Sequence, residues 1–258
     1  MDEPTVPINS VKRSYEIIDA IRDRGQAGVT ELSEALDHPK STVHNHLQTL
    51  EQLGYLVKTD EKYRLSTRYF HLGREARNTH EVFKHGIETV KRLEQESNRH
   101  VQLVIEENGI GAILFATHWR RDDYAPASDQ RSLTRVHLHT NAPGKAILAQ
   151  LPDERLSSII DRYGLPSRTE KTITNEQVLR SELETVRKQG YAIDRGEMID
   201  GSTGAGVAVE AGGRVYGAIA AYGPTGDLVP EAEDEAIVSL VNEHAETIQT
   251  DLIFGSTN

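Results

Sequence analysis

Short polar side chains recur at helical spacing between positions 40 and 52 of this 258-residue chain. Ser41, Asn45, Gln48 and Gln52 fall on one side of a helical wheel, and that side carries almost no charge. A helix face that meets only water usually carries Glu and Lys pairs. Amides and hydroxyls suit hydrogen bonds to base edges and phosphates, so the pattern favours a helix that reads DNA.

The opposite side of the same segment is apolar and predicts how the helix is held. Its apolar residues recur at i, i+4, i+7 and i+10 and form one stripe: Val43, Leu47, Leu50 and Leu53. Pro39 fits the first helical position, where a missing N–H costs nothing. Gly54 fits the left-handed position that ends a helix.

The segments on either side predict a winged helix–turn–helix. Upstream, Val29–Leu36 predicts a short helix capped by Thr30, with Asp37 and His38 as the turn. Downstream, 55–58 and 63–65 predict two strands around the polar turn 59–62. A hairpin directly after the DNA-reading helix is a wing.

These motifs resemble the IclR family of transcriptional regulators. The winged helix resembles the family along 10–13, 39–43, 50–56 and 63–65. Further along, 138–149 around Gly144-Lys145-Ala146 resembles its effector-domain signature, and 190–194 with 218–224 resembles its late strands. Motifs in the expected order thus cover nearly the whole chain.

The part after the wing alternates strands and helices, which predicts an α+β fold. Asn108-Gly109 and Gly212-Gly213 mark the turns of two hairpins, over 100–116 and 205–222. Helices are predicted over 81–97, 142–150, 153–163, 175–189 and 231–254. The resemblance implies three parts: a winged helix–turn–helix DNA-binding domain (1–65), a linker helix (66–80), and a GAF-like domain for effector binding and oligomerisation (81–258).

The formal net charge of −11 opposes binding to phosphates, so its distribution along the chain matters. Residues 1–77 hold 11 Lys and Arg against 12 Asp and Glu, which leaves 18 against 28 for 78–258. The acidity therefore lies mostly outside the DNA-reading part. Many acidic residues, few Lys relative to Arg and no Cys also resemble proteins of a salt-adapted organism, in which phosphate contacts are weakened.

No stretch approaches the roughly 18 apolar residues of a membrane span, and no apolar segment opens the chain. We therefore expect a cytoplasmic protein without a membrane partner. The absence of Cys excludes disulfides, thiol nucleophiles and thiolate zinc sites.

The expected partner of the first domain is double-stranded DNA. Asn45 and Gln48 are predicted to contact bases, while Lys40, Ser41 and Arg64 hold phosphates. The complete set of candidate DNA contacts is Arg13, Lys40, Ser41, Thr42, His44, Asn45, Gln48, Thr49, Lys62 and Arg64. One helix spans too few base pairs for selectivity, so a homodimer or homotetramer on a pseudo-palindromic operator is expected.

The resemblance also implies a small-molecule pocket beside the helix that follows Asn141. The candidate effector contacts are Asn141, Ala142, Gly144, Asp194, Thr203, Ala220 and Tyr222. Backbone N–H groups at a helix start attract carboxylates or phosphates. Side chains such as Asp194 and Tyr222 suit hydroxyls, so a carboxylate- or hydroxyl-bearing metabolite is expected. Purely structural roles are the alternative: Asp194 capping a turn, Gly144 permitting close packing, and Tyr222 filling the core.

Three other kinds of chemistry find little support. Gly144-Lys145 lacks the earlier Gly and the following Ser or Thr of a phosphate loop. His137 and His139 share one face if they lie on a strand, but no third ligand has metal-site spacing, so hydrogen-bonded His is the alternative to zinc. No Gly-x-Ser-x-Gly nucleophile motif is present, and no cofactor is expected.

We therefore expect a transcriptional regulator, not an enzyme, whose affinity for its operator responds to a metabolite of carbon catabolism. The alternative is a metabolite-binding enzyme or stand-alone sensor that uses the winged helix for protein contacts. The amide-rich helix face favours the regulator.

Overall fold

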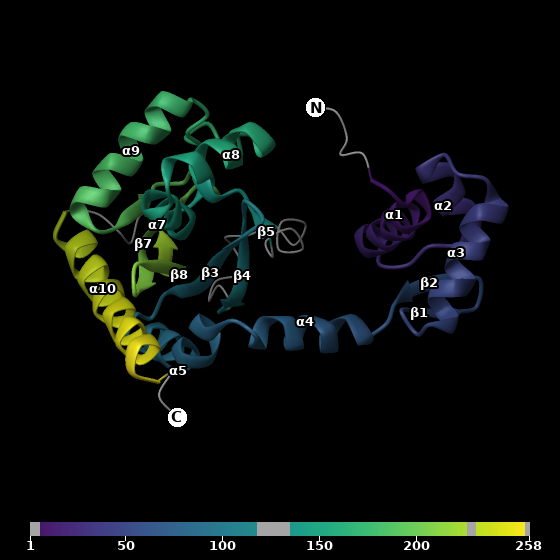
Figure 1. Cartoon of the computed structure of the whole chain (residues 1–258), viewed down its shortest axis with the longest axis horizontal. Coiled ribbons are helices and arrows are strands. Elements are labelled where there is room, and N and C mark those ends of the chain that lie inside the picture. Colours follow the sequence, from purple (N-terminus) through teal and green to yellow (C-terminus); the bar gives the residue numbers. More distant parts are fainter. Residues whose placement is uncertain (1–5, 118–134, 226–230, 256–258) are drawn as a thin grey trace. The chain divides into compact units, whose positions relative to one another are not determined.

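The structure, a computed structural model, describes residues 6–117, 135–225 and 231–255, the last range without the side chains of 231–234. It divides into two compact units, Met1–Arg77 and Asn78–Asn258 (Figure 1). Each unit has its own apolar core.

The first unit is a helical bundle with a two-stranded wing. Its elements are α1 (Asn9–Arg24), α2 (Val29–Leu36), α3 (Lys40–Gln52), β1 (Leu56–Thr59), β2 (Lys62–Leu65) and α4 (Arg68–Asn78). The core contains Ile17 and Ile21 of α1, Leu32 of α2, and Val43 and Leu47 of α3, all fully buried. The apolar stripe predicted for α3 thus forms the centre of the unit.

The C-terminal end of α3 follows the predicted signal, but Pro39 is the N-cap and not the first helical residue, which is Lys40. Gly54 has φ +77°, and the Tyr55 N–H donates to the Leu50 carbonyl at 2.8 Å, which closes the last turn. Leu53, expected at the end of the buried stripe, is 56% exposed. The reason is that Leu53 is the C-cap residue, where the chain leaves the helical path.

The cap predicted for α2 is wrong. The helix starts at Val29 with Gly28 as its N-cap, so Thr30 lies inside the first turn. The Glu31 carboxylate accepts the Gly28 N–H at 2.7 Å. A Glu at this third position satisfies the start of the helix from within, and no hydroxyl is needed.

The second unit is built on a six-stranded antiparallel sheet with the order β5-β4-β3-β8-β7-β6. The strands are β3 (His100–Glu107), β4 (Ile110–Ala116), β5 (Arg135–Val136), β6 (Ala192–Asp194), β7 (Ser202–Ala211) and β8 (Arg214–Pro224). Both hairpins turn where the sequence predicts, because Asn108 and Gly109, like Gly212 and Gly213, adopt the positive φ of a two-residue turn.

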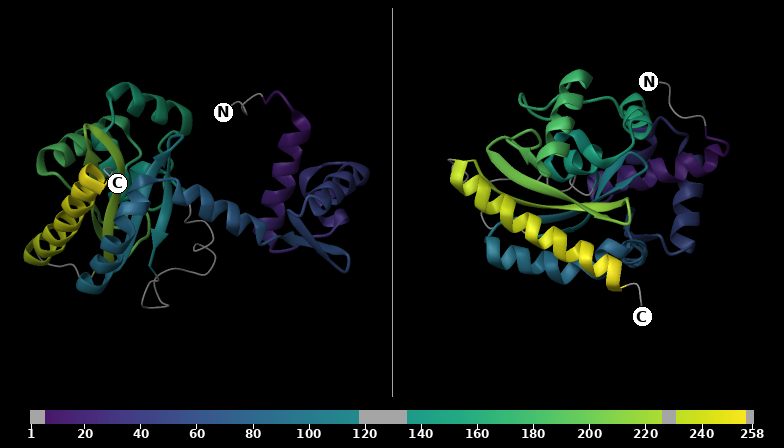
Figure 2. Two further views of the ribbon diagram at one scale, coloured as in Figure 1. Left: turned by 60° about the horizontal axis from the view of Figure 1, so that its bottom comes forward. Right: turned by 60° about the vertical axis from the view of Figure 1, so that its left-hand side comes forward.

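Helices cover both faces of this sheet (Figures 1 and 2). On one face lie α5 (Glu81–Ser97) and α10 (Glu231–Phe254), side by side. On the other lie the short helix η1 (Leu138–Thr140), α7 (Ala142–Gln150), α8 (Asp153–Tyr163) and α9 (Glu176–Gln189). We call the second face the α7 face; the candidate effector residues are at one end of it.

None of the helices in the described ranges is both long and apolar enough to cross a membrane.

Candidate functional site

The outer face of α3 is open to solvent and uncharged except at its start. Lys40, Ser41, His44, Asn45, Gln48 and Thr49 are exposed, and Thr42 is half-buried. Because Val43 and Leu47 anchor the opposite side, these side chains are held on a rigid helix. The arrangement suits contacts in a DNA groove.

Two further elements of the first unit, β2 and α1, also carry candidate cations. Arg64 on β2 is exposed, whereas Lys62 is half-buried and pairs with Glu31 at 3.0 Å. Arg13 on α1 is also exposed. The next residue, Ser14, is hydrogen-bonded through Oγ to Nδ1 of His46 on α3 at 2.8 Å. That bond fixes α1 against α3, and burial together with the charge of Arg13 lowers the pKa of His46.

The start of α4 is attached to the end of α3. Arg68 donates from Nη1 to the Leu53 carbonyl at 3.1 Å. Its guanidinium also lies 4.8 Å from the ring centre of Tyr55, whose ring is 5.5 Å from that of Tyr69. Because Leu53 and Tyr55 follow α3 directly, these contacts fix the start of α4 against the end of α3.

In the second unit, the α7 face of the sheet is polar at one end. Side chains alternate between the two faces of a strand, so His100, Gln102 and Val104 of β3 point to the same face. His100 lies opposite Tyr222 on β8, and Gln102 opposite Ala220. All of these residues are buried. Val104 belongs to the apolar core under α7, so the polar end is the one formed by His100, Gln102 and Tyr222.

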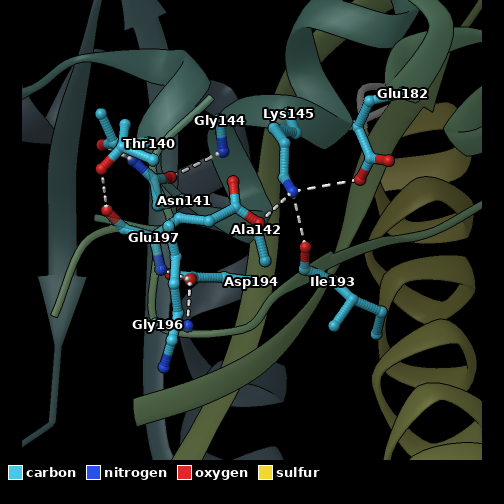
Figure 3. A network of polar contacts seen from close by, with 12 residues as sticks. Thr140, Asn141, Ala142, Gly144, Lys145, Glu182, Ile193, Asp194, Gly196 and Glu197 are labelled. Atoms are coloured by element: carbon cyan, nitrogen blue, oxygen red, sulfur yellow. Dashed lines mark hydrogen bonds and ion pairs between the residues drawn. The ribbon is translucent and has the colours of Figure 1, made fainter. Parts of the chain in front are cut away.

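A buried ion-pair network joins α7 to the loop after β6 (Figure 3). Lys145, only 1% exposed, donates from Nζ to Glu197 Oε1 at 2.6 Å, to the Ile193 carbonyl at 2.7 Å and to Glu182 Oε1 at 3.1 Å. The superficial resemblance to a phosphate loop therefore has a structural explanation. The lysine that follows Gly144 holds together α7, α9 and the β6 end.

Asp194 shapes the loop that presents Glu197. Its Oδ1 accepts the N–H groups of Gly196 at 3.0 Å and of Glu197 at 2.7 Å (Figure 3). Burial raises the pKa of Asp194 to about 7, although these two backbone bonds oppose the shift. The turn-capping role that the sequence left as an alternative is present in the structure.

The N-terminus of α7 is satisfied from within the protein, contrary to the expectation of free N–H groups. The Ala142 N–H donates to the Tyr222 hydroxyl at 3.2 Å. The Gly144 N–H donates to Asn141 Oδ1 at 2.8 Å, and the Lys145 N–H to the Asn141 carbonyl at 3.0 Å. Pro143 has no N–H. The first turn therefore has every backbone donor engaged.

Comparison with known proteins assigns both units. Residues 10–60 match the family model of the IclR helix-turn-helix domain, and residues 75–250 match the model described as bacterial transcriptional regulator IclR C-terminal. The chain belongs to the IclR family of transcriptional regulators. It is therefore a regulator of transcription and not an enzyme.

Two relatives show how far the similarity extends. The probable HTH-type transcriptional regulator ArcR of Halobacterium salinarum is 31% identical, over 95% of this chain and 94% of its own length. The acetate operon repressor of Salmonella typhimurium is 26% identical, over 74% of this chain and 70% of its own.

Solved structures share the whole architecture. The IclR of Thermotoga maritima has a TM-score of 0.75 at 24% identity, covering 95% of this chain and 98% of that one. An IclR homologue of Microbacterium hydrocarbonoxydans, solved in complex with 4-hydroxybenzoate, has a TM-score of 0.76 at 22% identity, covering 94% and 98%. Because the sequence identities are below 25%, these comparisons show only that the chain has the same α+β fold as these structures.

The fold brings most of the candidate effector residues of this IclR regulator together. Ala142, Ala220 and Tyr222 pack against one another, and Asn141 and Gly144 lie in the same first turn of α7. Thr203 is the exception. It lies opposite Gly223, one residue out of step with the Gly204–Tyr222 pair, so its side chain points to the other face of the sheet.

Five residues of the polar end were missed by the sequence reasoning: His100, Gln102, Lys145, Glu197 and Ser202. His100 and Gln102 do carry a signal, since they alternate with apolar residues in a strand that is buried on both faces. Ser202 lies on the α7 face of the sheet with Gly204 and Tyr222, so the hydroxyl on this face belongs to Ser202 and not to Thr203.

The two histidines considered for zinc are placed differently from the expectation. His137 and His139 lie at and within η1, not on a strand. His139 is hydrogen-bonded through Nε2 to the Pro166 carbonyl at 3.1 Å, and burial lowers its pKa to about 4. Within the described part of the chain, no group of three or more His, Asp or Glu side chains has the arrangement of a metal site.

The raised pKa of Asp194 predicts a pH effect on stability. Between its ordinary pKa of 3.8 and about 7, the folded protein holds a proton that the unfolded chain has released. The contribution of Asp194 to the free energy of unfolding therefore falls as pH rises through this window. An Asp194→Asn variant keeps the Oδ1 acceptor but cannot titrate. Its free energy of unfolding should therefore rise relative to that of the wild type from pH 4 to pH 7.

Urea unfolding of both proteins across this pH range measures the difference. His139 contributes the opposite slope below its ordinary pKa of 6.5, but it does so in both proteins and cancels. Parallel stability curves would show that Asp194 is already ionised at low pH.

Proposed function

We propose that the chain binds operator DNA through α3 and the wing, and that a small molecule at the polar end of the α7 face changes this affinity. The observation that carries the proposal is the outer face of α3, which is exposed, rigidly held and nearly uncharged. The family match supports a matching division of roles, in which residues 1–65 bind DNA, 66–80 form the linker, and 81–258 bind the effector and oligomerise. Because its partner is chromosomal DNA, the protein acts in the cytoplasm.

The reading of bases is assigned to Asn45 and Gln48. Both are exposed amides on α3, and amides pair well with the donor and acceptor edges of bases. The phosphate contacts are assigned to Lys40, Ser41 and Arg64, with further contacts from the candidates on α1, α3 and the wing. Lys62 reaches DNA only by leaving its ion pair with Glu31.

A homodimer is the proposed assembly. Large apolar side chains are exposed on α1 and α4, where Tyr15 is 63% exposed, Phe70 68% and Leu72 42%. Such residues suit contact with a second copy. Two α3 helices then read the half-sites of a pseudo-palindrome about one helical turn apart. Sedimentation showing a monomer that still binds one half-site tightly would contradict this assembly.

The proposed effector is a metabolite of carbon catabolism. Support comes from two relatives of different kinds: the Salmonella typhimurium protein is named for the acetate operon, and the Microbacterium hydrocarbonoxydans homologue was solved with 4-hydroxybenzoate. The buried polar residues at one end of the α7 face provide the site. A ligand changes DNA affinity only if it binds two arrangements of the dimer unequally. The attachment of α4 to α3 through Arg68 offers a route to the DNA-reading helix.

The Asn45→Ala and Arg64→Ala variants form a test of the DNA assignment. We expect Asn45→Ala to relax sequence preference at one or two base pairs, at a cost of about 1–3 kcal/mol. We expect Arg64→Ala to weaken binding to all sequences alike and to reduce its salt dependence. Selection from random DNA, repeated at low and high salt because of the acidic composition, measures both. An unchanged preference in Asn45→Ala would show that Asn45 does not read bases.

A further inference from the structure

This inference rests on the proposed effector site. We propose that the effector presents hydrogen-bond donors, in the form of hydroxyl or ammonium groups, to Glu197 and Ser202. It does not place a carboxylate against these two residues. This narrows the carboxylate- or hydroxyl-bearing class expected from the sequence. Hydrogen bonds, burial and charge around Glu197 each support it.

The first support is that all three N–H donors of the buried Lys145 ammonium are already engaged within the protein. An ammonium group carries three protons. Those of Lys145 are directed to Glu197, Ile193 and Glu182, at 2.6, 2.7 and 3.1 Å. A ligand carboxylate could reach this cation only by displacing one of these partners.

The second support is the N-terminus of α7, the other natural place for an anion. Its first-turn N–H groups are taken by the Tyr222 hydroxyl and by Asn141, as described above. The phenol of Tyr222 and the amide of Asn141 stand where an anion would otherwise bind. This helix start thus lacks a free donor.

Unused acceptors provide the third support. Within the described residues, Glu197 Oε2 and Ser202 Oγ are buried side-chain oxygens without a hydrogen-bond partner. Glu197 is 7% exposed and Ser202 3%. Figure 3 shows the Glu197 carboxylate between the Lys145 ammonium and the start of α7, inside the cluster of candidate effector residues. Leaving a buried carboxylate oxygen without a hydrogen bond destabilises the protein, so a ligand that donates a hydrogen bond to it is favoured.

Charge points the same way. Lys145 is the buried cation of the network, and it faces the carboxylates of Glu182 and Glu197. The nearby Lys171 is paired with Asp200 at 2.8 Å. A ligand carboxylate would add negative charge to a buried site in which repulsion is weakly screened. Hydroxyl donors carry no such cost, and an ammonium group gains attraction.

The test uses matched sets of probes that differ only in the group presented. One set is 4-hydroxybenzoate, 4-hydroxybenzyl alcohol and 4-hydroxybenzylamine; the other is gluconate, glucitol and 1-amino-1-deoxyglucitol. Thermal shift and calorimetry on the full-length protein measure binding of each at millimolar concentration. We expect the alcohol or amine member of a set to bind about tenfold more tightly than its acid.

Three variants locate the effect. Glu197→Gln keeps an oxygen for Lys145 but removes the charge, and Ser202→Ala removes the second acceptor; each should weaken the preferred probe about tenfold. Asp200→Asn is the matched control, since it removes an exposed carboxylate that pairs with Lys171 and not with Lys145, and it should leave affinity nearly unchanged. Circular dichroism checks that each variant is folded.

Tighter binding of the acid in either set overturns the proposal, and so does unchanged or improved binding in both Glu197→Gln and Ser202→Ala. Failure of every alcohol and amine to bind overturns it too. The proposed function fails differently: a probe that binds as expected but leaves operator affinity unchanged refutes the effector role while the ligand class stands.

Discussion

Lys145→Met is expected to lower the free energy of unfolding of the second unit by about 3–5 kcal/mol, the usual cost of removing one partner from a buried ion pair. Lys145 is 1% exposed and binds two carboxylates and a carbonyl. Methionine fills a similar volume, so the loss reports the charge left unpaired on Glu197. Urea unfolding followed by circular dichroism measures the change.

Lys171→Met is the matched control. Lys171 also forms a short ion pair, at 2.8 Å to Asp200, but both side chains are more than half exposed. Exposed pairs contribute about 1 kcal/mol or less, so this variant should unfold close to the wild type. If both variants lost the same free energy of unfolding, the Lys145 ion pairs would have to be exposed to water.

Gly144→Ala is expected to cost about 3 kcal/mol, the upper end of the usual range for overpacking. A Cβ at this position would lie 2.1 Å from the Leu138 carbonyl oxygen and 2.6 Å from the Leu138 Cα. Both are backbone atoms and cannot rotate away. The glycine permits α7 to start against η1, which is the packing role that the sequence left open beside ligand binding.

Gly73→Ala is the control for this substitution. Gly73 is an exposed helical glycine in α4, and a Cβ there has no atom within 4 Å. Alanine in an open helix should stabilise by about 0.5–1 kcal/mol. If Gly144→Ala kept wild-type stability instead, the close approach of α7 to η1 would be wrong.

Local signals explain how much of the fold was predictable from sequence. The face of α3, the turn at Asn108-Gly109 and the ends of α7 each depend on a few adjacent residues whose periodicity or φ preference is visible in the chain. The predictions for Leu53 and Thr30 are wrong because each depends on where a helix ends. Leu53 is the C-cap residue of α3, and the Glu31 carboxylate, not the Thr30 hydroxyl, satisfies the start of α2.

The site could be predicted only in part, because it depends on which residues meet across strands. Thr203 and Ser202 are neighbours of similar chemistry, and only the register of β7 against β8 decides which of them shares a face with Tyr222. Lys145 meets Glu182 and Glu197, 37 and 52 positions away. No local pattern shows that pairing, nor that Tyr222 occupies the α7 N-terminus.

The most direct test of the central claim is selection of binding sites from random double-stranded DNA by the wild-type protein. We predict enrichment of one sequence with two-fold related half-sites about one helical turn apart, and loss of preference at specific bases in Asn45→Ala. Binding without any enriched sequence, equally strong in wild type and Asn45→Ala, would contradict the assignment of α3 as the DNA-reading helix.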